Sequence, residues 1–561
     1  MKKYISRIGY VCCGLAVALT LTGCNDYLDK LPDERAELNT EEKITQLLVS
    51  AYPTCTNNLL VEVLSDNVSD NGRAYSSPAI VDQIYRFMDT TEEGNDTPYD
   101  IWGGYYASVA TVNEAIQGIE GLGSPASLQG DLAEAKLIRA YSMFMLAQTF
   151  CMAWDPNKAD EYLGLPYPLT PEQDINAQYE RGTLRELYAA IDKDIEEALP
   201  HIAEAAQNYV KPKYHFNVKA AYAFAARFNL YYMNYEKAIQ YASQVLGNDP
   251  TTVMRNYEPY RTLGREDFAN LWIRSEDQAN IMLLATYSIA PRYLTWATSS
   301  RFAHNYDVTA YETFWVDMPW GDGSNANSII SANNLYGSNQ CIAFPTYEEQ
   351  FEYTDKVAGI GYTHSVDPIF TGDMTILERA EAYCLTGQLE NAMKDINAWI
   401  GTHCKDKYDE DGNLVKAAPI NLTVADIVAF VTNTDYAKRT PDGNRDRSFR
   451  KHMHPQGFTI QAEGSDQECM LQFLLHMKRI ETVFHGVRMQ DLKRYGIEYT
   501  HPVAGEDRLV FIRGDLRGAI QIPNTVIAAG LPGNPRQTAD EIKAFVTQTE
   551  DEYKDPEDEE E

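Results

Sequence analysis

The sequence predicts a mostly α-helical protein with two helical hairpins and, between them, a loop-rich stretch that carries short strands. Three observations predict this fold class. Long segments repeat apolar residues at spacings of three and four, which is the period of an amphipathic helix. Two pairs of such segments carry small residues at matched positions. Between these pairs the helical period weakens, and Asn, Ser, Gly, Tyr and Trp become frequent.

Composition limits the function. The chain has 561 residues, of which 44% are hydrophobic and 23% charged, so it can bury a large core. It carries 48 basic and 81 acidic residues, a formal net charge of −33. Such a chain repels phosphate backbones, and we therefore expect no nucleic-acid partner.

Capping residues, helix breakers and small residues predict the bounds and the pairing of the helical segments. Thr183 and Glu186 form a capping-box pattern that opens a helix over 183–199. Further helices are predicted over 131–150 and over 465–495, the second interrupted near Gly486. Helix pairs are predicted at 217–232 with 235–246 and at 373–386 with 388–400.

Each helix pair resembles a tetratricopeptide repeat. Ala226 and Ala238 are twelve residues apart in the first pair, and Ala380 and Ala392 in the second. Small residues at these offsets let two antiparallel helices approach closely. The pairs are too far apart in the sequence to form a tandem array.

The N-terminus predicts export and lipidation. Residues 1–23 have a charged start and an apolar run too short to span a membrane, as in a signal peptide. Residues 21–24, Leu-Thr-Gly-Cys, look like a lipobox in which Cys24 carries the lipid. More than one acyl chain gives stable anchoring, so we expect the protein to be attached to a membrane through lipid alone. Residues 24–45 are then a lipidated leader.

Signs of catalysis and of metal or cofactor binding are sparse. The sequence has no phosphate-binding loop, no zinc-protease motif, no nucleophile elbow and no dinucleotide fingerprint. We therefore expect no catalytic residues, no cofactor and no metal ligands. The six remaining cysteines form no CxxC pair, and most of them are predicted to be isolated buried thiols: Cys55, Cys151, Cys341, Cys384, Cys404 and Cys469.

Several ordered segments resemble the SusD/RagB family of outer-membrane lipoproteins. They lie between the lipobox and about residue 537. A central segment at 134–141, EAKLIRAY, is similar to the family's EA-x-FLRAY motif, and further similar segments lie at 101–116, 165–168, 181–188, 478–494 and 519–523. The 478–494 segment departs from the family pattern at His485, where the family has Glu, and at Met489, where it has Trp. Arg488 and Asp491 are three apart and are expected to pair on one helix face.

The resemblance implies a SusD-like body whose parts follow in order. We expect an N-terminal part with helical hairpins over 46–250, a loop-rich ligand face over 251–372, a C-terminal part over 373–540 and an acidic tail over 541–561. It also implies that the protein is exposed on the outside of the cell outer membrane. There it would capture oligosaccharide or polysaccharide and deliver it to a TonB-dependent SusC-like barrel. A peptide-binding lid of the same family and a surface glycoside hydrolase remain alternatives.

Candidate ligand residues come from two loop-like stretches. Sugar rings have apolar C–H faces that can stack on aromatic rings, so exposed aromatic residues beside polar groups are the best candidates. These are Trp296, Trp320 and Tyr293 from the middle of the chain, and Asp66, Asn67, Arg73 and Tyr75 from the earlier loop. Asn305, Asp322 and Asn325 are their expected polar neighbours. Trp315 is expected in the core, and Trp102 and Arg139 in core or helix packing.

Overall fold

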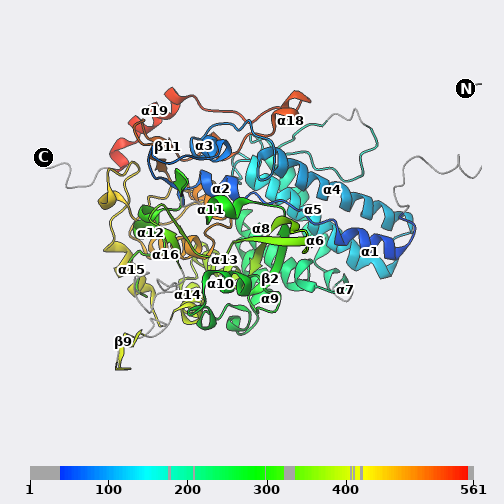
Figure 1. The fold of residues 1–561 in the computed structure, drawn as a ribbon, viewed down its shortest axis with the longest axis horizontal. Coiled ribbons are helices and arrows are strands. Elements are labelled where there is room, and N and C mark those ends of the chain that lie inside the picture. Colours follow the sequence, from blue (N-terminus) through cyan, green and yellow to red (C-terminus); the bar gives the residue numbers. More distant parts are fainter. Residues whose placement is uncertain are drawn as a thin grey trace, which may run out of the picture.

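The computed structural model describes residues 38–174, 179–205, 209–296, 299–320, 335–404, 407–408, 411–416 and 421–553. The predicted signal peptide, Cys24, the first part of the predicted leader and residues 554–561 of the expected acidic tail lie outside the described residues. Helices dominate the fold, and the strands form small sheets among them (Figure 1). The mostly α-helical prediction is confirmed.

The N-terminal part is a layer of packed helices at one end of the molecule (Figure 1). It contains α1 (Glu41–Val49), α4 (Pro98–Gly121), α5 (Gln129–Phe150), α6 (Leu184–Ala198) and α7 (Ile202–Ala205). The long helix α5 packs between α4 and α6. The predicted capping box is present, because the Thr183 side chain accepts the Glu186 N–H and the Glu186 carboxylate accepts the Thr183 N–H.

Both predicted helix pairs form hairpins. They are α8 (Val218–Tyr231) with α9 (Tyr235–Leu246), and α13 (Gly372–Leu385) with α14 (Leu389–His403). Helix α9 packs against α13, so two hairpins far apart in the sequence form one layer. The four matched alanines are buried: Ala226, Ala238, Ala380 and Ala392. Gly387 has a φ of 75° where α13 turns into α14, a conformation that favours glycine.

The middle of the chain combines short helices with strands. The helices are α10 (Arg265–Trp272), α11 (Ala290–Leu294) and α12 (Tyr306–Glu312). The largest sheet has the order β2 (Asn280–Thr286), β7 (Ile360–Thr371) and β6 (Glu349–Asp355), all antiparallel. A hairpin joins β4 (Tyr336–Ser338) to β5 (Cys341–Ala343), and β1 (Ser69–Asp70) pairs with β3 (Phe302–Ala303).

The C-terminal part covers the hairpin layer. The predicted helical segment over 465–495 forms two helices, α16 (Asp466–Glu481) and α17 (Arg488–Arg494). Gly486, where the interruption was expected, lies between them with a φ of 72°. Helix α15 (Val424–Thr432) packs against α16, and α2 (Asn58–Leu64) contacts α17. The remaining elements are α3 (Ala79–Tyr85), α18 (Asn524–Ala528), α19 (Ala539–Gln548), β8 (Lys407–Tyr408), β9 (Leu414–Lys416), β10 (Tyr499–His501) and β11 (Leu509–Phe511).

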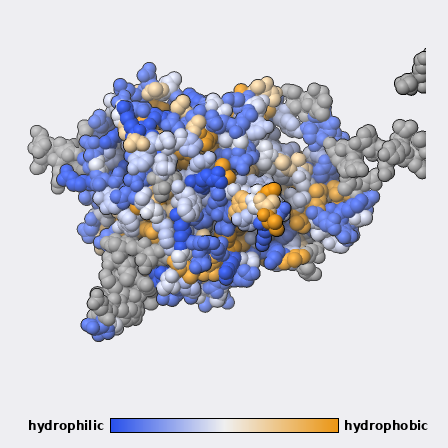
Figure 2. Space-filling view, viewed as in Figure 1, coloured by the Kyte–Doolittle hydropathy of each residue, from blue (hydrophilic) through white to orange (hydrophobic). Residues whose placement is uncertain are grey.

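One large apolar core runs through these parts. All six of these cysteines are buried. Hydrophilic residues cover most of the face in Figure 2, and apolar residues gather there in small separate patches. Among the described residues, no helix combines the length and apolar character needed to cross a membrane.

Candidate functional site

The two loop-like stretches chosen from the sequence lie side by side. The pairing of β1 with β3 places Ser69 opposite Ala303 and Asp70 opposite Phe302. Beyond these strands, the Arg301 N–H donates to the Ser76 carbonyl at 2.9 Å. Residues 69–78 and 299–303 therefore form one surface, although more than two hundred residues separate them in the sequence.

Trp296 is an exposed aromatic residue that lies three positions before the second of these stretches in the sequence. It follows α11, and its side chain is 56% exposed. The indole Nε1–H donates to Glu348 Oε2 at 2.6 Å. The guanidinium of Arg265 lies over the ring, with its central carbon 3.8 Å from the ring centroid. The ring is thus held at its polar edge and on one face, while much of its surface stays open to solvent.

A buried ion pair holds this arrangement together. Arg265 Nη2 lies 2.6 Å from Glu348 Oε1 and also donates to the Thr295 carbonyl at 2.9 Å. Burial raises the pKa of Glu348, and the hydrogen bonds and charge of Arg265 act in the opposite direction. Because Glu348 bonds to both the guanidinium and the indole, it fixes the positions of the two side chains relative to each other.

Three further candidates from the sequence lie near the surface. Arg73 is exposed, and its guanidinium donates to the Ala504 and Gly505 carbonyls at 2.7 and 2.8 Å. Tyr75 is half-buried in the same loop. Tyr293 is half-buried and packs against the core from α11. These three residues remain candidates for ligand contact.

Trp320 is not available as a platform. It is 3% exposed and packs against Trp399 of α14 and Phe473 of α16, with ring centroids 5.9 and 5.5 Å apart. The prediction was wrong because the flanking Gly and Asn residues indicate a loop but do not reveal which distant rings lie beneath it. Asp322 and Asn325 lie outside the described residues.

Asp66 and Asn67 are also buried, and their choice as ligand residues was wrong. Asp66 lies 2.8 Å from Arg488, 3.0 Å from Lys451 and 3.3 Å from Arg479. Burial alone would raise the pKa of the Asp66 carboxyl, but these three cations hold it well below its usual value. Asn67 donates to Glu62 and accepts from Arg479, each at 2.8 Å.

The expected pairing of Arg488 with Asp491 was wrong, because Arg488 pairs with Asp66 of this cluster. Arg488 bonds to Asp66, while Asp491 lies 2.8 Å from Lys478 and 3.3 Å from Arg494. The charged residues of the 478–494 segment therefore join α16 and α17 to distant parts of the chain rather than only to each other.

Sequence reasoning missed an aromatic group on and after α12. Tyr306 is 40% exposed, and its ring lies 5.6 Å from that of Trp315 and 6.4 Å from that of Tyr311. Trp315 is half-buried rather than fully in the core. Asn305 caps α12 and donates to Asn71 Oδ1 at 3.1 Å, which joins this group to the earlier loop. The dense Tyr and Trp content of 306–315 is the signal that could have identified it.

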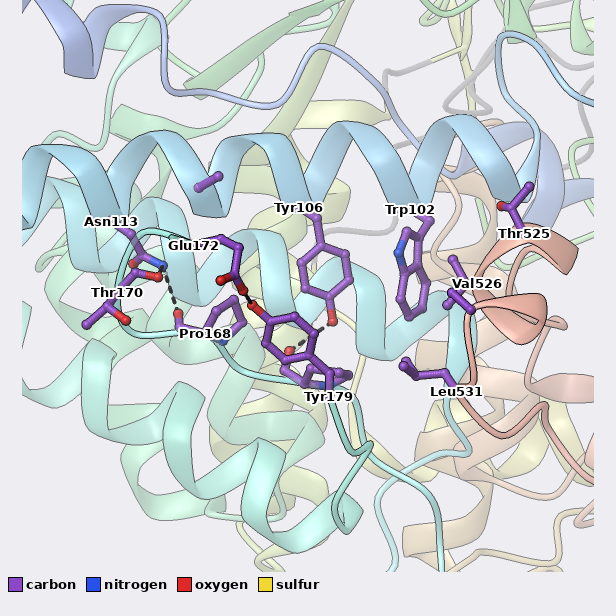
Figure 3. A pocket seen from close by; sticks show the side chains of 13 residues that line it. Trp102, Tyr106, Asn113, Pro168, Thr170, Glu172, Tyr179, Thr525, Val526 and Leu531 are labelled. Carbon is purple, nitrogen blue, oxygen red and sulfur yellow. Dashed lines mark hydrogen bonds between the residues drawn. The ribbon is translucent and has the colours of Figure 1, made fainter. Parts of the chain in front are cut away.

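A cavity of about 410 Å³ lies beside α4 (Figure 3). Trp102 and Tyr106 point into it from α4, and Tyr179 faces them from the loop before α6. Trp102 is half-buried, so it combines helix packing with a surface open to the cavity. Arg139 is structural as expected, because it is buried and bonds to both carboxylate oxygens of Asp194.

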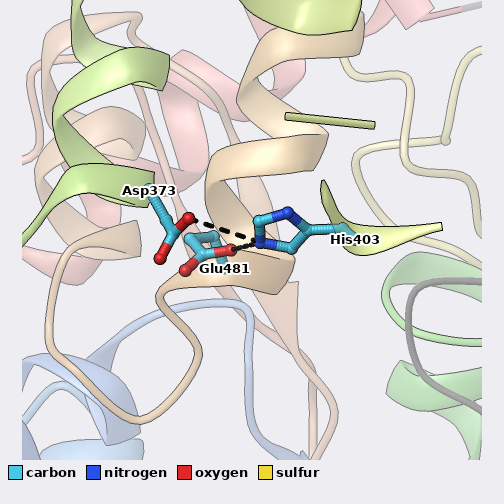
Figure 4. Close-up of side chains that lie close together, drawn as sticks. All are labelled: Asp373, His403 and Glu481. Carbon is cyan, nitrogen blue, oxygen red and sulfur yellow. Dashed lines mark hydrogen bonds and ion pairs between the residues drawn. The ribbon is translucent and has the colours of Figure 1, made fainter. Parts of the chain in front are cut away.

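One buried group could hold a metal ion among the described residues (Figure 4). His403 Nε2 lies 3.2 Å from Glu481 Oε2 and 3.8 Å from Asp373 Oδ1. Burial raises the pKa of both carboxyls to about 7 and lowers the pKa of His403 to about 4. Arg255 already provides a positive charge 4.0 Å from Asp373. A proton shared between His403 and a neighbouring carboxylate accounts for the short distances in this group. All three side chains are sealed from solvent, so this group joins three helix ends and is not part of a surface binding site.

The chain thus combines helical hairpins with a loop region that carries an exposed indole held by Arg265 and Glu348. Residues 26–230 match the family model of SusD-like proteins described as starch-binding associating with outer membrane. This match supports the resemblance to the SusD/RagB family for the N-terminal part of the chain. No curated protein is a significant match to the chain.

Solved structures share the fold over nearly their whole length. A SusD superfamily protein from Bacteroides thetaiotaomicron is 17% identical, with a TM-score of 0.55 and coverage of 89% of this chain and 98% of that one. One from Bacteroides fragilis is 17% identical, with a TM-score of 0.53 and coverage of 87% and 96%. A SusD-like carbohydrate binding protein from Bacteroides vulgatus is 13% identical, with a TM-score of 0.52 and coverage of 87% and 95%. At these identities the likeness shows the fold alone.

Proposed function

We propose that this protein captures oligosaccharide or polysaccharide at the cell surface and holds it against the exposed ring of Trp296. The observation that carries the proposal is that ring, 56% exposed yet fixed by Arg265 and Glu348. A ring that is already oriented loses little conformational freedom on binding, so more of the stacking energy appears as affinity. The family description, starch-binding, and the carbohydrate-binding structural neighbour support the same ligand class.

Polar groups on the surface formed by residues 69–78 and 299–303, which begins three residues after Trp296 in the chain, suit the hydroxyl groups of a sugar. Arg73 and Tyr75 lie on that surface, and Tyr306 with Trp315 forms a second aromatic group. By analogy with base stacking, each ring in contact with a sugar is expected to contribute about 1–3 kcal/mol. No catalytic step is part of the proposal.

Affinity electrophoresis tests this function. The detergent-solubilised full chain is run through gels that contain soluble starch, dextran, xylan or laminarin. At least one polysaccharide should retard the protein, and Trp296→Ala should abolish most of the retardation. Tyr99→Ala is the matched control, because Tyr99 is another exposed aromatic residue, 49% exposed on α4, that is not among the residues holding Trp296. Normal retardation of the Trp296 variant would place the ligand elsewhere.

We further propose that the protein is lipid-anchored through Cys24 and faces the cell exterior. There it would serve a TonB-dependent SusC-like barrel. The family description supports association with the outer membrane. A tagged full chain extracted from outer membranes in mild detergent should bring down a large β-barrel protein. Recovery of the tagged chain alone, under conditions that keep other barrel–lipoprotein pairs intact, would argue against delivery to a barrel.

The alternative of a peptide ligand has one observation in its favour. Strand β6 is an edge of its sheet, and most of its residues are exposed. An extended peptide can pair with such an edge through backbone hydrogen bonds. Retention of tryptic casein peptides by immobilised protein, with no retardation by any polysaccharide, would favour the peptide ligand. Release of shortened labelled polysaccharide would instead indicate a glycoside hydrolase.

A further inference from the structure

We propose that the cavity beside α4 is a second saccharide-binding site, separate from the surface at Trp296. This inference rests on the proposed glycan-binding function and extends it to a different part of the molecule. The residues that line the cavity come from α4, from the loop before α6 and from the segment around α18. None of them belongs to the Trp296 surface.

Aromatic rings form the walls of the cavity. Trp102 and Tyr106 are one helical turn apart on α4, with ring centroids 4.9 Å apart and planes inclined by 46°. Phe150 meets the Trp102 ring in a T-shaped contact at 5.4 Å, which fixes the indole from the core side. Tyr179 faces these rings from the other wall (Figure 3). The cavity therefore offers aromatic faces on two sides, as required to stack on the C–H faces of a sugar ring.

Polar groups lie among these rings. The Tyr106 hydroxyl donates to the Pro166 carbonyl at 2.9 Å, and its oxygen keeps lone pairs to accept another hydrogen bond. The Glu172 carboxylate accepts from the Tyr179 hydroxyl, and a carboxylate has about four lone-pair sites in all. The hydroxyls of Thr170 and Thr525 also line the cavity. Acceptors and donors are thus available for sugar hydroxyl groups beside the stacking surfaces.

The shape of the cavity favours a ligand made of several linked sugar rings. Its volume of about 410 Å³ is within the usual range for ligand pockets. The lining residues Trp102, Tyr106, Ala110 and Asn113 recur every three or four positions, so the cavity follows α4 for about 16 Å, at 1.5 Å per residue. A cavity of that length fits several consecutive sugar units better than one compact molecule.

The charge of the lining narrows the ligand class. Glu172 is the charged side chain among the described lining residues, which include no Lys or Arg. An acidic polysaccharide would bring its carboxylates close to Glu172 with no Lys or Arg in this lining to offset them, in a protein whose formal net charge is already −33. The geometry therefore points to a neutral glycan.

Calorimetric titration of the detergent-solubilised full chain tests the second site. The probes are maltoheptaose and cellohexaose, two neutral oligosaccharides with different linkages. Trp296→Ala removes the first site and should leave weaker binding to at least one probe. Adding Ala110→Trp should then weaken this residual binding by about tenfold or more, equivalent to about 1.4 kcal/mol, because the new indole fills the cavity. Ala110 is exposed at the cavity wall, so the substitution should not disturb the core.

Matched variants make each outcome decisive. Trp102→Ala should have the same effect as Ala110→Trp, whereas Tyr99→Ala on the same helix should leave residual binding unchanged. If Trp296→Ala abolishes all binding, or if the residual binding persists in the Ala110 variant, the second site is wrong while glycan binding stands. If the unaltered protein binds neither probe nor any polysaccharide in the gels, both proposals fail. Thermal unfolding of each variant confirms that the fold is intact.

Discussion

The guanidinium of Arg265 lies over the indole of Trp296, and both groups bond to the same carboxylate of Glu348. The Arg265 and Glu348 side chains are only 16% and 6% exposed, whereas the indole is mostly open to solvent. The arrangement is therefore a buried ion pair that supports an exposed ring. It separates two roles, since Trp296 offers the contact surface and Arg265 fixes its orientation.

Arg265→Ala should weaken glycan binding less than Trp296→Ala does. The ring remains, but it must lose its regained freedom on binding, which costs about 0.5–1.5 kcal/mol for one side chain. We expect a three- to tenfold loss of affinity in gel retardation. Arg265→Lys keeps the charge but not the flat stacked group, so its affinity should lie between that of the original protein and that of Arg265→Ala. An unchanged affinity for Arg265→Ala would show that the ring needs no support.

Trp320→Ala should destabilise the protein strongly. The residue is 3% exposed and packs against Trp399 and Phe473, and truncation of a buried Trp to Ala costs about 3–5 kcal/mol. Trp296→Ala is the matched control and should cost less, because the residue is 56% exposed and the change mainly removes one hydrogen bond to Glu348, which contributes about 0.5–1.5 kcal/mol. Urea unfolding of both variants measures the difference. Equal stabilities would contradict the placement of Trp320 in the core.

Local signals in the sequence predicted much of the fold. The capping box at Thr183, the turn at Gly387 and the break near Gly486 all depend on neighbouring residues, and the structure has each of them. The buried state of Asp66 depends instead on Arg479, which lies 413 positions away. No local pattern shows that three cations will surround that carboxylate. For the same reason Trp296 was correctly expected to be exposed, whereas Trp320 was expected to be exposed and is buried.

Asp66→Asn should be costly for stability. The substitution keeps the shape of the side chain but leaves Lys451, Arg479 and Arg488 close together without that negative charge. Breaking a buried ion pair on one side typically costs about 3–5 kcal/mol. Asp442→Asn is the control, because Asp442 pairs with Arg508 at the surface with a side chain that is 92% exposed. A loss of similar size in both variants, measured by urea unfolding, would contradict the importance of the buried cluster.

Lys493 should make stability depend on pH in the alkaline range. Burial lowers the pKa of its amino group to about 8, and the group donates to the carbonyls of Gln148, Cys151 and Gly518. Between pH 8 and 10.5 the unfolded chain keeps a proton on Lys493 that the folded protein has lost. The unfolded state then binds more protons, so this group makes the free energy of unfolding rise with pH, by up to about 3 kcal/mol.

Lys493→Met isolates this contribution. The difference in unfolding free energy between the original protein and the variant should change steadily from pH 8 to 10.5 in favour of the original protein. Other groups that titrate in this range, such as exposed tyrosines, are common to both proteins and cancel in the difference. Parallel stability curves for the two proteins would show that Lys493 keeps an ordinary pKa.

Cys24→Ala should release the protein from the membrane. The residue lies outside the described part of the chain, and the expectation rests on Leu-Thr-Gly-Cys at the end of a charged and apolar leader. More than one acyl chain holds a protein on a membrane stably, and none can be attached without the thiol. In cells fed a labelled fatty acid, the original protein should carry label in the membrane fraction. The variant should carry no label and should appear in the soluble fraction or as uncleaved precursor. Cys55→Ala is the control, since Cys55 is a buried free thiol and its removal should leave labelling unchanged. Label on the Cys24 variant would show that the anchor is elsewhere, because acylation of that thiol is the only modification the leader motif predicts.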